Sequence, residues 1–342
     1  MTRRTVFLMG VAGLAGCYRP GGQRLNVFNW PEYVAPDTIP NFEREFGVRV
    51  RYGTYESLEE MLARVMTGNS GWDVAFPANY FIGPMRHLDL LAPLDHRRIP
   101  NLKNLDAPYQ RPHWDPELQT CVPYMWGATG IVYQASLRPE PVAWADLWEA
   151  RFRNRLTMLD DPAEVIDAAL LKLGYPMNSE DPRQLAAAKR EAEAQKPLLR
   201  AYVSEIVRDQ LVAGELLASQ LWRTTAMRAM EAAPDRLRFV YPKEGFPIYA
   251  DNLVILRESK RQELAHAFIN YIMRPAVAAK ISETKLEATC NAAARAVSRE
   301  DIRNHPILYP EEATMARAQW FEPLSGTGQR LRDRIWTEIK SS

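Results

Sequence analysis

The stretch "RLNVFNWPEYVAPDTIPNFEREFGVRVRY" (residues 24–52) carries the signals of a complete strand–helix–strand unit. Its apolar start (24–29) and the alternating side chains over 48–52 predict two strands. Between them, apolar residues recur at helical spacing and a glycine follows the last one, which predicts a helix over 37–47. Strands that are joined through a helix pair in parallel, so this stretch predicts an α/β fold.

The same alternation of strand and helix signals continues along the chain. Ser57, with Glu60 three residues later, forms a capping-box pattern that indicates where the next helix begins. Further strands are expected at residues 72–77, 123–134, 155–161, 215–222, 237–242 and 245–256. Further helices are expected at residues 57–68, 82–95, 161–174, 181–196, 223–234, 261–283 with a break at Pro275, and 328–340.

With 342 residues, the chain is long enough for two domains of typical size. The strand over 123–134 leaves the first unit, and the apolar strand over 245–256 returns to it without a flexible linker. The predicted fold class is therefore α/β with two lobes, each a mostly parallel sheet flanked by helices, and a hinge between the lobes. The first lobe is expected to contain residues 25–133 plus 247–300, and the second residues 134–246 plus 301–342.

The N-terminal segment has the layout of an export signal. Residues 1–16 have a basic start, an apolar stretch and small residues, and they are too short to span a membrane as a stable helix. The "LAGC" that ends at Cys17 resembles a bacterial lipobox, so we expect Cys17 to be lipidated and residues 17–24 to form a short tether. The alternative is an ordinary thiol beside an ordinary cleavage site.

Composition excludes some classes of function. The chain has 43 Lys+Arg against 42 Asp+Glu, and this near-zero net charge argues against a nucleic-acid partner. No later stretch is long and apolar enough to cross a bilayer. Cys121 and Cys290 could form a disulfide after export or remain two buried thiols, and the sequence leaves both options open.

Common catalytic and metal-binding signatures are missing from the sequence. It contains no G-x-S-x-G elbow, no P-loop and no G-x-G-x-x-G, and its cysteines lack a protease context. The histidines do not pair at metal-ligand spacing; they are His87, His96, His113, His266 and His305. We therefore predict no catalytic residue, no metal site and no cofactor.

Carboxylates beside aromatic side chains are the remaining chemical signal. Trp30, Glu32 and Tyr33 follow the first strand, and Tyr80 follows the strand over 72–77. Ligands of open parallel sheets bind beyond the carboxyl ends of the strands, so these two loops are expected at one edge of the first sheet.

Similar signals occur in the second half of the chain. Asp251 shares one face of a strand with Tyr249, and an aspartate in an apolar strand is unfavourable unless it is paired or hydrated. Asp161 and Glu164 fit a helix cap and its capping box, which could be their entire role. Trp222, at the end of another strand, suits either the core or a ligand platform.

A pocket of aromatic faces with carboxylates at its ends would suit a flexible organic cation. Aromatic faces attract ammonium groups, each such contact being worth about 0.5–2 kcal/mol. Carboxylates add charge-assisted hydrogen bonds that fix the positions of the ammonium groups.

The chain also resembles a known family, the periplasmic spermidine/putrescine-binding proteins that serve ABC importers. The resemblance extends over nearly the whole mature length and rests on the order and spacing of quoted blocks. They are "FNWPEYVAPDTIPNFEREFGVRV", "TYES", "WDVAFPANYF", "PYMWGATG", "WADLWE", "LDDPAEV", "LKLGY", "YPKEG", "INYIMRP" and "RIWTEIK".

This resemblance implies two α/β lobes that close about a hinge on a polyamine held between aromatic rings and carboxylates. The implied binding residues are Trp30, Glu32, Tyr33, Tyr80, Asp161, Glu164, Trp222, Tyr249 and Asp251. Asp161 can then both cap a helix and face the ligand.

Several positions depart from the family pattern. Pro31 and Ala78 stand where many relatives have a hydroxyl residue, and Glu287 replaces an aromatic residue. Phe321 occupies a position that can be a glutamine. Arg223 follows Trp222, and its charge would oppose a polyamine unless the side chain points away.

The function expected from the resemblance is that of a periplasmic or extracytoplasmic lipoprotein that captures a polyamine and delivers it to an ABC permease in the inner membrane. One alternative is a binder or sensor of another cationic solute. A second is a hydrolase that uses Asp161 or Asp251 as acid and base, which turnover would distinguish from binding. A structural or adhesion lipoprotein, which would have no small-molecule pocket, is a third.

Overall fold

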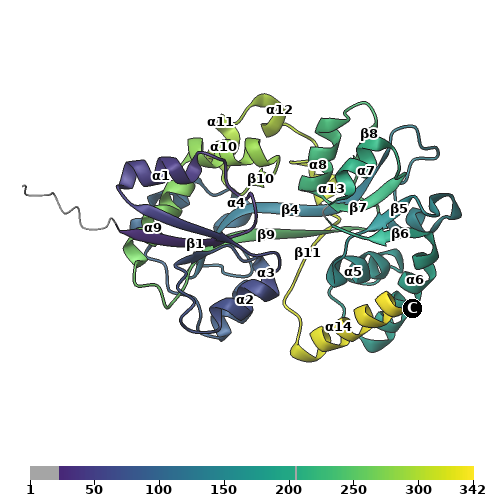
Figure 1. The fold of residues 1–342 in the computed structure, drawn as a ribbon, viewed down its shortest axis with the longest axis horizontal. Helices are drawn as coiled ribbons and strands as arrows, with labels where there is room; N and C mark the ends of the chain where they lie inside the picture. Colours follow the sequence, from purple (N-terminus) through teal and green to yellow (C-terminus); the bar gives the residue numbers. More distant parts are fainter. Residues whose placement is uncertain (1–22, 205) are drawn as a thin grey trace, which may run out of the picture.

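The computed structural model describes residues 23–204 and 206–342. The predicted signal peptide, Cys17 and most of the tether lie outside the described residues. The described chain is an α/β structure whose helices flank strands in two halves (Figure 1). Within residues 23–204 and 206–342, no helix combines the length and the apolarity needed to cross a membrane.

The first half contains the strand–helix–strand unit predicted from residues 24–52. Strands β1 (Arg24–Asn29) and β2 (Arg49–Thr54) pair in parallel, and β3 (Val74–Ala75) pairs in parallel with β1 on its other side. Helix α1 (Thr38–Phe46) joins the first two strands and ends at Gly47, whose φ of 66° is readily adopted by glycine. The unit is therefore built as its local signals predict.

The other helices of this half are α2 (Leu58–Val65), α3 (Asn79–His87) and α4 (Ala107–Gln110). The Ser57 side chain caps α2 by accepting from the backbone N–H of Glu60, as predicted. The prediction of a helix over 82–95 was wrong beyond His87. The chain turns there because Asp89 adopts a left-handed conformation with a φ of 57°, and Leu91 then forms a bridge with Leu256.

Two long strands connect the halves. The first residues of β4 (Cys121–Gln134) pair antiparallel with β9 (Phe246–Ile255), and its last residues pair with strands of the second half. β4 and β9 lie side by side through the middle of the molecule (Figure 1). A third connection is β11 (Ala318–Trp320), which pairs in parallel with β9. The pairing is thus mixed: β1 pairs in parallel with β2 and β3, and β9 with β11, whereas β4 pairs antiparallel with β9 and with strands of the second half.

The second half holds four further strands and their helices. The strands are β5 (Leu156–Met158), β6 (Leu199–Tyr202), β7 (Ala218–Trp222) and β8 (Leu237–Val240). The helices are α5 (Pro162–Lys172), α6 (Pro182–Gln195), α7 (Val207–Ala213) and α8 (Arg223–Ala232).

The remaining chain returns to the first half and ends in the second. Its elements are α9 (Gln262–Ile272), α10 (Pro275–Lys285), β10 (Ala288–Thr289), α11 (Ala292–Val297), α12 (Glu300–Arg303), α13 (Glu312–Met315) and α14 (Gly326–Ser341). The break predicted at Pro275 is confirmed, with the proline in the first turn of α10. Short 3₁₀ helices occupy His96–Arg98, Pro100–Asn104, Trp144–Trp148, Ala150–Phe152 and Lys196–Leu198.

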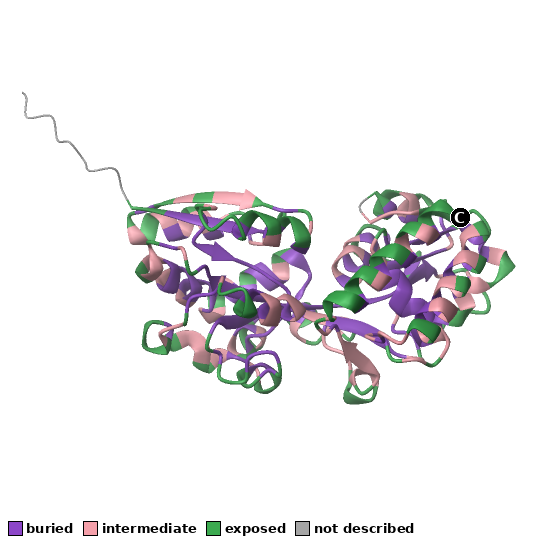
Figure 2. Cartoon of the chain, turned by 90° about the horizontal axis from the view of Figure 1, so that it is seen from below, coloured by how far each residue is buried: buried purple, intermediate pink, exposed green. Residues whose placement is uncertain are grey.

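Each half has its own buried apolar core. Aromatic residues such as Phe42 and Phe76 fill the core of the first half, whereas Trp144 and Phe152 belong to a separate core in the second. Figure 2 shows two groups of buried segments joined by a narrow connection. Cys121 and Cys290 are both buried and form no disulfide, which decides between the two options left open by the sequence.

Candidate functional site

The predicted site residues come from five separate segments of the fold. Trp30, Glu32 and Tyr33 lie in the loop after β1, and Tyr80 lies in the first turn of α3. Tyr249 and Asp251 belong to β9, one of the strands that cross between the halves. The other three lie in the second half, where Asp161 and Glu164 begin α5 and Trp222 ends β7.

Asp251 is buried without a cationic partner. Its side chain is 4% exposed, and its Oδ2 accepts a hydrogen bond from the Tyr33 hydroxyl at 2.6 Å. Burial raises the pKa of Asp251 to about 7; the hydrogen bond from Tyr33 lowers it, and the charge of Glu287 raises it. Among the described residues, no lysine or arginine is a main cause of this shift. The group is therefore an acid that a nearby cation would ionise.

Asp161 caps α5, as predicted, because its Oδ1 accepts from the backbone N–H of Glu164 at 3.0 Å. The second half of the predicted capping box was wrong. The Glu164 carboxylate does not return to the backbone of Asp161, and its Oε1 instead accepts from Thr129 Oγ1 at 2.7 Å and Trp222 Nε1 at 2.8 Å. Those two donors draw Glu164 away from the helix end.

Glu164 is the second buried acid without a cation. Its side chain is 2% exposed, and its Oε2 has no hydrogen-bond partner within the described part of the chain. Burial raises the pKa of Glu164 well above its ordinary value, and the charge of Asp161 raises it further. Burial also raises the pKa of Asp161, although hydrogen bonds from backbone N–H groups lower it. This pair is poised to bind a positive group.

Tyr80 lies close to both groups of acids, Asp251 and the pair Asp161 and Glu164. Burial raises the pKa of its hydroxyl well above the ordinary value, and nearby carboxylates raise it further; among them are Asp161, Asp251 and Glu164. Its ring lies 5.4 Å from the ring of Phe321, and it packs against the cores of both halves. A tyrosine from the first half thus lies near carboxylates of the second half.

Tyr249 makes a similar link from β9. Burial raises the pKa of its hydroxyl, and the charges of Glu287, Asp251 and Glu164 add to the shift in that order. Its ring lies across Gly127 on the neighbouring strand, where any side chain would meet the ring at 2.3 Å. The glycine therefore gives Tyr249 room to lie over β4.

Glu32 is placed differently from the other predicted residues. Its side chain is 76% exposed, and its Oε2 lies 3.8 Å from Arg228 of α8. Trp30, two residues earlier, directs its indole N–H to the backbone carbonyl of Phe76 at 3.2 Å. The structure thus brings eight of the nine residues into the half-buried or buried cluster and leaves Glu32 at its exposed margin.

The charge of Arg223, which the sequence left as a concern, is taken up within the protein. Arg223 and Glu287 are both buried and form an ion pair at 2.5 Å. The guanidinium also donates to the carbonyl groups of Trp126 and Leu308 and lies 4.1 Å from the Trp126 ring centroid. Two departures from the family pattern therefore compensate each other.

Two supporting residues had no clear role from the sequence. Thr129 orients Glu164, but a single threonine in an apolar strand gives no local signal for that role. Asn79 donates to the Phe321 carbonyl at 2.8 Å and accepts from the backbone N–H of Ala250 at 3.0 Å. Its position after a strand was noticeable, but its bonds to distant segments were not predictable.

Taken together, the geometry is that of a receptor for a cation with more than one positive group. The charges of Asp251 and Glu164, neither of which pairs with a cation of the described residues, both act on the hydroxyl groups of Tyr80 and Tyr249, so aromatic side chains and unpaired carboxylates lie near one another. The described residues contain no group of three or more His, Cys, Asp or Glu side chains placed to hold a metal ion. An organic cation with separated charges fits this arrangement.

Comparison with known proteins gives the family of this chain. The family described as bacterial extracellular solute-binding proteins matches residues 38–309. The spermidine/putrescine-binding periplasmic protein of Salmonella typhimurium is 34% identical over 332 residues, which cover 96% of this chain and 95% of that protein. These matches confirm the resemblance inferred from the sequence blocks.

Solved structures show the same fold. The substrate-binding protein PotD of a spermidine/putrescine ABC transporter from Streptococcus pneumoniae superposes with a TM-score of 0.83 at 29% identity, covering 93% of this chain and 99% of that one. The Tp0655 lipoprotein (TpPotD) of Treponema pallidum superposes with a TM-score of 0.85 at 26% identity and the same coverage. The two-lobed α/β architecture is therefore confirmed.

Proposed function

This chain belongs to the bacterial extracellular solute-binding proteins, and on that premise we propose that it captures a polyamine of the putrescine/spermidine class and delivers it to an ABC permease. The observation that carries the proposal is the burial of Asp251 and Glu164 without any cation from the described residues. A buried carboxylate is unfavourable unless it is neutralised or paired. A polyamine supplies the missing positive charges at both ends.

The aromatic residues give the ligand its second set of contacts. Trp30, Tyr80, Trp222 and Tyr249 are half-buried, so their rings keep surface for the methylene groups and ammonium groups of an amine. Tyr33 holds Asp251, and Trp222 holds Glu164. In this account these residues position the carboxylates while they line the ligand site.

Capture is proposed to proceed by closure of two lobes. The proposed lobes are residues 25–133 plus 247–300 and residues 134–246 plus 301–342. Strands β4, β9 and β11 are the connections about which the lobes would move. Because the ligand contacts both lobes, its binding would shift the population toward a closed form that the permease recognises.

Binding without chemical change is part of the proposal. The buried acids are held by hydrogen bonds from Thr129, Trp222 and Tyr33, which suits fixed ammonium positions. Incubation with a polyamine, followed by mass analysis of the recovered ligand, should return it unaltered. Formation of any product would favour the hydrolase alternative.

We also propose that the protein is exported from the cytoplasm and that a lipid attached to Cys17 anchors it to a membrane. The support is the "LAGC" pattern and the likeness to a solved lipoprotein of the same fold. Stable anchoring needs more than one acyl chain, as a diacylated cysteine would provide. The exported protein should fractionate with membranes, and Cys17→Ser should abolish that association. A fully soluble wild type without lipid mass on the mature N-terminus would refute the anchor.

Calorimetry with a panel of amines tests the central proposal. Putrescine, spermidine and spermine are the probes, and a neutral diol of similar length is the control. At least one amine should bind, and added salt should weaken it wherever water reaches the ion pairs. Absence of binding by all three amines over a wide concentration range would refute polyamine capture.

A further inference from the structure

Helix α8 determines which acidic groups of the site already have a cation. Arg223, its first residue, forms the buried ion pair with Glu287, and Arg228 lies 3.8 Å from Glu32. α8 follows β7 in the second half, whereas Glu287 and Glu32 follow α10 and β1 in the first half. One helix thus brings two positive charges to two acids on the other side.

Arg223 is held firmly in this position. Its side chain is fully buried, and it donates to the Leu308 carbonyl at 3.1 Å and to the Trp126 carbonyl. A guanidinium remains charged at any ordinary pH, so this positive charge cannot be removed by titration. Arg223 therefore remains a charged partner of Glu287 over the ordinary pH range.

Glu287 is close enough to act on the site. Its charge contributes to the raised pKa values of Tyr33, Tyr249 and Asp251. Without Arg223, Glu287 would be an additional carboxylate for a ligand ammonium at the Asp251 end. With Arg223 at 2.5 Å, the pair is neutral overall.

The negative charge of Glu32, at the exposed margin of the site, is also offset by positive charges of the protein. Lys285, at the end of α10, is 7% exposed. Burial lowers the pKa of Lys285, the charge of Arg228 lowers it further, and the charge of Glu32 opposes both effects. The charges of both Arg228 and Lys285 therefore interact with Glu32, and Arg228 lies within ion-pair distance of it.

We infer that α8 makes the site selective for a dication, so that a linear diamine binds more tightly than a triamine or tetraamine. This inference rests on the proposed function and specifies its ligand. Among the buried and half-buried acids whose charges act on Tyr80 or Tyr249, those without an ion-pair partner in the described chain are Asp251, Asp161 and Glu164; Glu59 also acts on Tyr80 but is exposed to water. One ammonium group is assigned to Asp251 and a second to the adjacent Asp161 and Glu164. A third ammonium would meet carboxylates that arginines already pair, and it would lose water without gaining a counter-charge.

The test is the ratio of the dissociation constants for spermidine and putrescine, measured by calorimetry on four proteins. In the wild type, putrescine should bind at least about tenfold more tightly than spermidine. Arg228→Gln should favour spermidine by about two- to fivefold, as expected for loss of a partly exposed ion pair. Arg223→Gln removes the cation that pairs with the buried Glu287 and should change the ratio by about tenfold in favour of spermidine.

Arg183→Gln is the matched control. It also replaces an arginine by glutamine, but on α6, where the Arg183 side chain is 94% exposed. It should leave the ratio unchanged. If Arg223→Gln does not fold, Arg228→Gln decides the matter, since Arg228 is partly exposed. A wild type that binds spermidine as tightly as putrescine would overturn the inference, as would an unchanged ratio in the arginine variants that fold. Either result would leave polyamine capture intact, whereas absence of all amine binding would refute the proposed function itself.

Discussion

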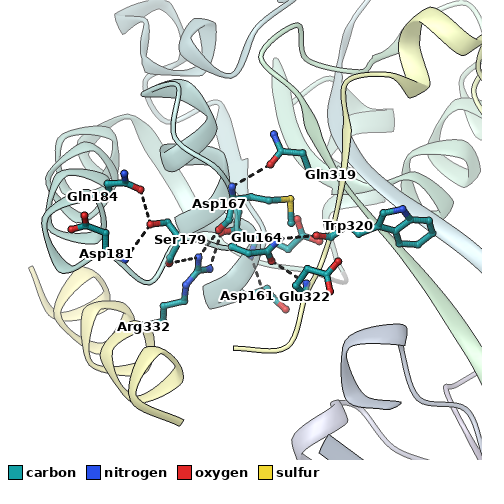
Figure 3. A network of polar contacts seen from close by, with 12 residues as sticks. Asp161, Glu164, Asp167, Ser179, Asp181, Gln184, Gln319, Trp320, Glu322 and Arg332 are labelled. Carbon is teal, nitrogen blue, oxygen red and sulfur yellow. Dashed lines mark hydrogen bonds and ion pairs between the residues drawn. The ribbon is translucent and has the colours of Figure 1, made fainter. Parts of the chain in front are cut away.

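Helix α5 carries acidic residues at intervals of three, and the fold treats two of them differently. Asp167, in the middle of the helix, pairs with Arg332 of α14 at 2.7 Å (Figure 3). Glu164, one turn earlier, accepts only from Thr129 and Trp222 and has no cation among the described residues. Each acid keeps one oxygen without a hydrogen bond, so the difference lies in the counter-charge. Under the proposed function, a buried acid without an internal cation is a site where the ligand supplies the positive charge.

The same contrast recurs in the first half of the molecule. Glu287 has Arg223, whereas Asp251 accepts a hydrogen bond from the Tyr33 hydroxyl and forms no ion pair with a described residue. Both carboxylates are almost fully buried, so burial alone does not distinguish a structural acid from a ligand-binding one. What distinguishes them is whether the protein supplies the positive charge.

Loss of a buried ion pair within the protein should have the largest effect, and the quantity affected should be the free energy of unfolding. Arg332→Met would leave Asp167 buried beside no cation and would also remove hydrogen bonds to the carbonyl groups of Met177 and Ser179. Loss of one partner of such a pair costs about 3–5 kcal/mol in the free energy of unfolding. Denaturant titration measures the loss, with Arg334→Met on the exposed face of the same helix as the control. A variant as stable as the wild type would show that the Asp167 pair contributes little.

Asp251→Asn should weaken ligand binding without lowering the stability of the empty protein. Removal of the charge that faces a ligand ammonium should weaken polyamine binding by roughly 2–5 kcal/mol. Because the folded-state pKa of Asp251 is raised to about 7, the ionised carboxyl destabilises the empty protein as the pH rises through 7. The variant should therefore unfold at an equal or higher temperature than the wild type at pH 8 without ligand. Reduced stability with unchanged affinity would place Asp251 among the structural acids.

The smallest expected effect separates the two roles of Asp161. Asparagine caps helices about as well as aspartate, so Asp161→Asn should leave the melting temperature of the empty protein nearly unchanged. Its affinity for a polyamine should nevertheless fall by about tenfold, equivalent to 1.4 kcal/mol. Asp161→Ala should lose both the affinity and about 0.5–2 kcal/mol of stability. Wild-type affinity in Asp161→Asn would reduce Asp161 to a helix cap.

Much of this molecule could be predicted from local sequence. The two strands and the helix within residues 24–52 follow from apolar periodicity, and Asp251 stood out because an acid is unusual in an apolar strand. The helix predicted over 82–95 failed after His87, because a left-handed residue at Asp89 has no strong sequence signature. Local sequence patterns thus predict most strands and helices and identify Asp251 as a candidate binding residue.

The counter-charges could not be predicted in this way. Arg332 and Asp167 are 165 residues apart, and Arg223 and Glu287 are 64 apart. Such pairs form only when the complete fold brings two segments together, so no local pattern identifies them. Because these pairs decide which acids stay available, the sequence could suggest the site but not its balance of charges.

Proton release on ligand binding tests the central claim most directly. Ammonium groups of putrescine are fully protonated near neutral pH, so any proton released must come from the protein. Putrescine would be titrated into the wild type by calorimetry at pH 6.5 in two buffers that differ in ionisation enthalpy. Because a bound cation favours the ionised form of Asp251, whose pKa is about 7 when the site is empty, roughly half a proton or more should be released per ligand. Release should decrease in Asp251→Asn and above pH 8. Binding with no proton release, or with net uptake, would contradict the claim that acids without an internal cation receive the ligand.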